Sequence, residues 1–104
     1  MPEAYGSPDG MCIDSEGKLW IAHWGGHCVR LWNPKTADVL QKVEVDASHV
    51  TSCCFGGKNL DTLYITTARS GLSKNQLKEF PKSGGLYVFE PEVKGTPITY
   101  FKDY

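Results

Sequence analysis

This sequence lacks a strong net charge and long apolar runs, and each absence narrows the kinds of protein it can be. Its 11 Lys and Arg residues nearly balance its 12 Asp and Glu residues, which leaves a formal net charge of −1. That balance argues against a nucleic-acid footprint, a polybasic membrane patch and a disordered chain. No apolar run approaches the roughly 18 residues of a membrane span, and the N-terminus has neither a basic region nor an apolar signal core.

The chain of 104 residues is one domain at most. We therefore expect a neutral soluble protein with a cytoplasmic address, which binds neither nucleic acid nor a membrane.

Metal-binding cysteine spacings are also missing. The four cysteines are Cys12, Cys28, Cys53 and Cys54; they form no Cys-x-x-Cys pair, and no His stands at zinc-finger spacing. Three of them lie in apolar strand-like runs and Cys28 adjoins another, so we expect reduced structural thiols, with disulfides or metal ligation as the alternatives. Adjacent strand residues point to opposite faces, so Cys53 and Cys54 cannot both enter one core.

A strong helical pattern is absent too, and short segments rich in β-branched and aromatic residues recur between turn signals instead. The first series of predicted strands covers residues 11–14, 18–22, 28–32 and 39–45. The second covers 50–55, 63–67, 85–89 and 98–101. Residues 73–80 predict a capped turn or one short helix, with Ser73 as the N-cap.

The two series resemble each other. Residues 19–22 (LWIA) align with 63–66 (LYIT) at an offset of 44, and residues 12–13 (CI) align with 54–55 (CF) at an offset of 42. Four-stranded units at this spacing are typical of propeller blades. We predict an all-β fold of two four-stranded antiparallel β-propeller blades, at about 8–46 and 49–104, with an insertion at about 68–84 that shapes a rim or a pocket. A small sandwich or barrel is the alternative.

Residues 7–14 (SPDGMCID) place a carboxylate where a strand begins. Pro8 holds the backbone extended and Gly10 tolerates dihedrals that other residues avoid, so we expect Asp9 just before the apolar strand. An Asp in this position either hydrogen-bonds its own backbone in a turn or carries out chemistry at the mouth of the strand.

Several ungapped blocks resemble one known family. They are 8–14 (PDGMCID), 17–22 (GKLWIA), 51–60 (TSCCFGGKNL), 63–69 (LYITTAR) and 83–87 (SGGLY). Together they look like the C-terminal third of the regucalcin, or senescence marker protein-30, family, which is the gluconolactonase and luciferin-regenerating-enzyme-like group. The resemblance implies a six-bladed β-propeller that holds one divalent cation on its axis and hydrolyses sugar lactones.

The resemblance also implies a role for Asp9. In the family, the Asp of the Pro-Asp-Gly motif is a metal ligand at the top of the central channel and the usual candidate for the base that activates water. Asp9 is therefore the expected ligand and base, with calcium or zinc as the cation and a small sugar lactone as the substrate. The remaining family ligands, a Glu and Asn residues, come from earlier blades. We expect either a piece of a longer chain or a homo-oligomer, for which a trimer would close the ring.

Other polar side chains are weaker candidates. His23 and Trp24 follow a strand, where they could line a channel or rim, with a surface or packing role as the alternative. Arg69 follows a strand end, where it faces the channel, anchors the insertion or forms an ion pair. Ser52 lacks the Gly-x-Ser-x-Gly context of a nucleophile. Two functions remain: a metal-dependent lactonase that is incomplete as a single chain, or a non-catalytic half-propeller that binds a partner or serves as a scaffold.

Overall fold

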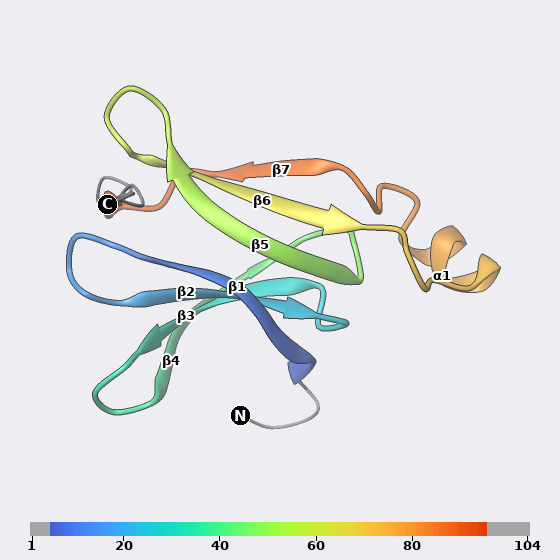
Figure 1. The fold of residues 1–104 in the computed structure, drawn as a ribbon, viewed down its shortest axis with the longest axis horizontal. Coiled ribbons are helices and arrows are strands. Elements are labelled where there is room, and N and C mark those ends of the chain that lie inside the picture. Colours follow the sequence, from blue (N-terminus) through green and yellow to red (C-terminus); the bar gives the residue numbers. More distant parts are fainter. Residues whose placement is uncertain (1–4, 96–104) are drawn as a thin grey trace, which may run out of the picture.

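The computed structural model describes residues 5–95, which form two antiparallel β-units (Figure 1). The first unit contains β1 (Ser7–Ile13), β2 (Leu19–Trp24), β3 (Cys28–Asn33) and β4 (Asp38–Glu44). The second contains β5 (His49–Gly56), β6 (Thr62–Ala68) and β7 (Leu86–Phe89), with α1 (Lys74–Glu79) between β6 and β7. Every predicted strand in this range is present, and the strand expected at 98–101 lies outside the described residues.

The strands of the first unit end at residues suited to tight turns. Gly17 and Gly25, which follow β1 and β2, have φ angles of 78° and 80°, values that glycine adopts without a steric penalty. After β3, the Asn33 side chain accepts a hydrogen bond from the Lys35 backbone N–H at 3.0 Å and starts the turn into β4. Local turn chemistry therefore accounts for the meander of the first unit.

The two units are joined by strand pairing at one residue pair only. The strand order is β4-β3-β2-β5-β6-β7, with β1 paired to β2, and all these pairs are antiparallel. Between the units, β2 and β5 share one register pair, Trp24 with His49. The rings of these two residues stack with centroids 4.0 Å apart. The predicted all-β fold built from propeller-type blades is confirmed.

The hydrophobic core lies between the two blades. Its buried members are Trp20, Ala22, Val29, Val45, Ala47, Val50, Cys53, Phe55, Leu63 and Ile65. The Trp20 ring lies 6.1 Å from the Phe55 ring and 6.3 Å from the Phe89 ring, centroid to centroid, so one aromatic side chain of the first blade fills the space between two of the second. The blades therefore pack face to face, which is how propeller blades stack.

The 44-residue repeat is visible in this packing. Leu63 and Ile65 bring one face of β6 into the core, whereas Trp20 and Ala22 bring the opposite face of β2 into it. Each blade thus has one face in the shared core and one face turned away from the other blade.

The insertion between β6 and β7 carries the predicted short helix. Ser73 caps α1: its Oγ accepts from the Gln76 backbone N–H at 3.2 Å, and Gln76 Oε1 accepts from the Ser73 N–H at 2.9 Å. None of the six residues of α1 is buried, and Figure 1 shows the helix projecting beyond the end of β6. Within residues 5–95, no helix has the length and apolar character needed to cross a membrane.

Candidate functional site

Asp9 lies inside β1, not just before the strand as the sequence predicted. The register of β1 on β2 pairs Pro8 with His23 and Met11 with Ile21, so Asp9 and Gly10 together oppose one residue, Ala22. Two residues opposite one make a β-bulge, a feature that re-aims side chains and is common beside active sites. Asp9 is exposed. Its carboxylate therefore comes from the irregular part of a strand that is otherwise well paired.

The bulge of β1 is braced against β5. A Cβ atom on Gly10 would collide with Ser52 Oγ and would lie 2.9 Å from Ser52 Cα. Only a residue without a side chain allows the two strands this close. The second blade thereby supports the backbone that presents Asp9.

A second bulge occupies the equivalent place in the second blade. The register of β5 on β6 pairs Val50 with Thr67 and Ser52 with Thr66, which leaves Thr51 without a partner. Thr51 follows Asp9 by 42 residues, the same offset that relates Cys12 to Cys54. Its hydroxyl lies 2.6 Å from Thr66 Oγ1. Thr51 is thus the positional counterpart of Asp9, related to it by the same 42-residue offset in the sequence.

Asp9 suits a divalent cation only as one ligand among several. An exposed carboxylate is the type of donor that hard cations take, but calcium needs roughly six to eight oxygens. Within residues 5–95, no group of three or more His, Cys, Asp and Glu side chains is placed to hold a metal ion. Among residues 5–95, Asp9 is therefore a single oxygen donor without a neighbouring set of acidic or imidazole ligands.

Asp14 has a structural role, because its carboxylate is buried and hydrogen-bonded within the chain. It is 2% exposed, and its carboxylate accepts from the backbone N–H groups of Glu16 and Lys18 at 2.9 and 3.0 Å. The other oxygen accepts from the indole N–H of Trp20 at 3.0 Å. These bonds join the β1–β2 turn to the core between the blades.

His23 is fully buried in β2, not on an exposed rim. Its ring lies between Tyr5 and Trp32, at centroid distances of 6.3 and 6.2 Å. Burial, and to a smaller extent the nearby Arg30 guanidinium, lower the pKa of His23 to about 4. The imidazole is therefore neutral at pH 7, and its surroundings are those of a packing residue.

Trp24 and Arg69 have structural contacts as well. Trp24 stacks on His49 at the junction of the blades. Arg69 is exposed, and its Nη1 donates to the Ser83 carbonyl at 3.4 Å across the base of the insertion. Among the described residues, the only salt bridge is between Lys42 and Glu44. Of the three roles considered for Arg69, its contacts fit that of an anchor for the insertion.

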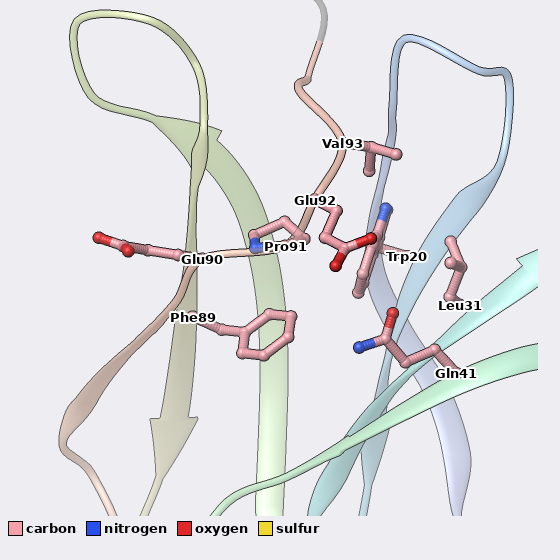
Figure 2. Close-up of a pocket in the computed structure, with 8 residues that line it drawn as sticks. All are labelled: Trp20, Leu31, Gln41, Phe89, Glu90, Pro91, Glu92 and Val93. Atoms are coloured by element: carbon pink, nitrogen blue, oxygen red, sulfur yellow. The ribbon is translucent and has the colours of Figure 1, made fainter.

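A pocket of about 490 Å³ opens between the blades. It is lined by Trp20, Leu31, Gln41, Phe89, Glu90, Pro91, Glu92 and Val93. Figure 2 shows the Gln41 amide and the Glu92 carboxylate pointing into the space between the Trp20 and Phe89 rings, whereas the Glu90 carboxylate points away. Asp9 is not part of this lining, so the pocket does not bring the predicted site residues together.

Comparison with known proteins identifies clear relatives. Residues 1–69 match the family described as SMP-30/Gluconolactonase/LRE-like region. The chain is 49% identical over 96 residues to regucalcin of Homo sapiens and 48% identical over 92 residues to regucalcin of Oryctolagus cuniculus. These alignments cover 89% and 86% of this chain but 32% and 30% of the two relatives. The chain thus spans about a third of the length of the curated relatives it matches.

Solved structures agree with the sequence relatives. A calcium-binding protein, regucalcin, from Agrobacterium tumefaciens aligns with a TM-score of 0.79 at 29% identity, over 86% of this chain and 30% of that one. A luciferin-regenerating enzyme aligns with a TM-score of 0.73 at 35% identity, over 90% of this chain and 31% of that one. The two blades are therefore arranged as in regucalcin-like propellers.

Proposed function

This chain belongs to the SMP-30/gluconolactonase/LRE-like family, and from that premise we propose that it forms part of a divalent-cation-dependent hydrolase of sugar lactones. The observation that carries the proposal is the Asp9 carboxylate, exposed in a β-bulge that the neighbouring blade braces. A lactone is a cyclic ester, so its hydrolysis requires a polarised carbonyl and a water molecule that gives up a proton. A cation can polarise the carbonyl, and an exposed carboxylate beside it can accept the proton of the water molecule.

Asp9 has two roles in this proposal. When bound, the cation would polarise the lactone carbonyl. One carboxylate oxygen of Asp9 would hold the cation, and the other would accept the proton of the attacking water. The contact between Gly10 and Ser52 keeps the backbone of Asp9 in place, which limits the reorganisation needed during the reaction.

One carboxylate does not complete the site, and we infer that other copies of this chain provide the remaining ligands. Two faces are open within residues 5–95. The first open face, on the first blade, consists of Met11, Ile13 and Leu19; Ile21 shares their register but is only 8% exposed. The second open face, on the second blade, consists of Cys54, Tyr64, Leu86 and Val88.

Both open faces are apolar enough to form an interface. Residues that pair directly across antiparallel strands share a face, so each set forms a continuous surface. Met11 and Ile13 are 53% and 47% exposed, and Leu86 and Val88 are 64% and 63% exposed. Burial of these large hydrophobic side chains between copies would stabilise an assembly.

The repeat makes the two open faces complementary. Within the chain, the Trp20 face of the first blade packs on the Leu63 face of the second. The 44-residue offset relates Leu19 to Leu63 and Trp20 to Tyr64. The second open face of one copy would therefore pack on the first open face of the next as a repetition of the internal interface. Such head-to-tail contacts form a ring when the rotation closes.

The length of the relatives suggests how many copies close the ring. The chain covers 30% of one regucalcin and 32% of another, so three copies amount to about one such relative. A ring of three copies would bring three Asp9 carboxylates toward one axis. That set of oxygen donors is far better suited to a divalent cation than a single carboxylate.

The Asp9→Asn variant tests the site. Asn is nearly isosteric but uncharged, so calcium binding measured by titration calorimetry and lactone hydrolysis should both be lost. The unfolding free energy should change by well under about 2 kcal/mol, because Asp9 is exposed. Asp38→Asn, an exposed acid at the start of β4, is the matched control and should retain both properties. An Asp9→Asn protein with metal-responsive activity would remove Asp9 from the site.

Light scattering with and without calcium tests the assembly. We expect three times the 11.5 kDa mass of the chain, and a single-chain mass for Val88→Arg. Leu40→Arg is the control, because Leu40 is 50% exposed but is the extra residue of a bulge in β4 and belongs to neither open face. A monomeric unmodified chain would overturn the assembly. A trimer that neither binds calcium nor hydrolyses lactones would leave the assembly standing and favour the non-catalytic binding or scaffold module.

A further inference from the structure

Two cysteine sulfurs from different blades lie next to each other. Cys12 is in β1 and Cys53 is in β5, 41 residues later, and their Sγ atoms are 3.7 Å apart. Cys12 is partly exposed and Cys53 is 4% exposed. Both are free thiols. The sequence spacing gave no reason to pair them, since they belong to separate blades.

The structure holds these two thiols together from both sides. The close approach of Gly10 to Ser52 brings β1 and β5 together two residues from Cys12 and one residue from Cys53. Cys53 Sγ also donates to the Trp20 carbonyl at 3.3 Å, which directs its side chain toward the first blade. The meeting of the sulfurs is therefore a consequence of how the inner strands pack.

The environment gives the two thiols unequal reactivity. The hydrogen bond between them lowers the pKa of Cys12 and raises the pKa of Cys53, and burial raises the pKa of Cys53 further. The thiolate is the nucleophile in thiol–disulfide exchange. Cys12, which is also the more accessible of the two, is thus suited to attack first.

We propose that Cys12 and Cys53 form a reversible dithiol–disulfide pair that links the inner strands of the two blades. The oxidant is a small disulfide such as oxidised glutathione. The Cys12 thiolate attacks one of its sulfurs and releases one glutathione thiolate. The Cys53 sulfur then attacks Cys12 Sγ, and the second glutathione leaves with the Cys53 proton as a thiol. Two protein thiols are oxidised, and one glutathione disulfide is reduced to two thiols.

The geometry requires only a small movement. A disulfide bond is about 2.0 Å long and the two Sγ atoms are 3.7 Å apart, so the sulfurs must approach each other by about 1.7 Å. The other two cysteines are poorly placed to compete. Cys54 lies on the opposite face of β5 and is exposed, and Cys28 is completely buried in β3, where burial raises its pKa.

The disulfide would have two consequences. It would close a loop between residues 12 and 53, which restricts the unfolded chain and raises the thermal midpoint. It would also fix β1, the strand that carries Asp9, against the second blade. The inference does not rest on the proposed function, because thiol counts and peptide linkage report on it directly.

The experiment uses the Cys54→Ser chain, which removes the exposed thiol that glutathione would modify independently. After incubation of the folded protein with oxidised glutathione, we expect free thiols counted in denaturant to fall from three to one. Dithiothreitol should restore all three. Trypsin should release residues 1–18 linked to residues 43–58, because these peptides carry Cys12 and Cys53 and are bounded by Lys18, Lys42 and Lys58.

Two further variants keep the proposal falsifiable. Cys12→Ser in the Cys54→Ser background should abolish the linked peptide and the rise in thermal midpoint, and its partly exposed position makes it the safer variant for folding. Cys53→Ser in the same background should also abolish the linked peptide and the rise in thermal midpoint. Three free thiols after oxidation of the Cys54→Ser chain, or a glutathione adduct on Cys12 that never resolves, would overturn the proposal.

Discussion

At the scale of single residues, Asp14 is the polar anchor of the first blade. Asn at this position would replace one acceptor oxygen with a donor group that faces a donor, at a site that is 2% exposed. We expect Asp14→Asn to lower the unfolding free energy by about 1–3 kcal/mol in chemical denaturation. Asp38→Asn, at an exposed strand start, should stay within about 0.5 kcal/mol. Equal losses in the two variants would mean that the Asp14 hydrogen bonds add nothing.

Another single residue, His23, makes the unfolding free energy depend on pH. Its pKa is about 4 in the folded chain and about 6.5 when exposed, because burial and then Arg30 disfavour the charged form. The unfolded chain therefore binds more protons between these values. The stabilising contribution is complete above about pH 6.5 and is lost as the pH falls toward 4, by up to about 1.4 kcal/mol per pH unit.

The His23→Phe variant provides the measurement. Denaturant unfolding of both proteins at several pH values between 4 and 7 should show a slope in the parent that is smaller in the variant. If the two slopes coincide, His23 does not titrate on unfolding.

At the scale of elements, α1 depends on its cap more than on packing. Ser73→Ala removes half of the capping box, which costs about 1 kcal/mol of helix stability. Since no residue of α1 is buried, global unfolding should stay unchanged. Hydrogen exchange at the Leu77 amide, which donates to the Ser73 carbonyl, should speed up about fivefold. Ser70→Ala, outside the cap, is the control, and a matching acceleration there would contradict the assignment.

At the scale of the whole molecule, folding and assembly should be coupled. If the two open faces bury each other between copies, dilution favours the separated and less stable chain. The thermal midpoint should then rise with protein concentration in the parent and in Leu40→Arg. Val88→Arg, altered on the second open face, should have a lower midpoint that does not depend on concentration. A concentration-independent parent would argue against coupling.

The sequence by itself determined what depends on near neighbours. Alternating apolar residues and turn signals located all seven described strands, and Ser73 marked the start of α1. The 44-residue repeat identified the blades, since each is one supersecondary unit with its own local pattern. The Pro-Asp-Gly motif selected Asp9, although whether it acts on a cation is still a prediction.

The tertiary structure decided what depends on contacts between distant segments. It placed Asp9 in a bulge because β1 shifts its register on β2, and it buried His23 because Tyr5 and Trp32 close around it. It also brought Cys12 to Cys53, across two blades. Register shifts and blade packing arise from the fit of whole strands against one another, a fit that no local stretch of sequence encodes.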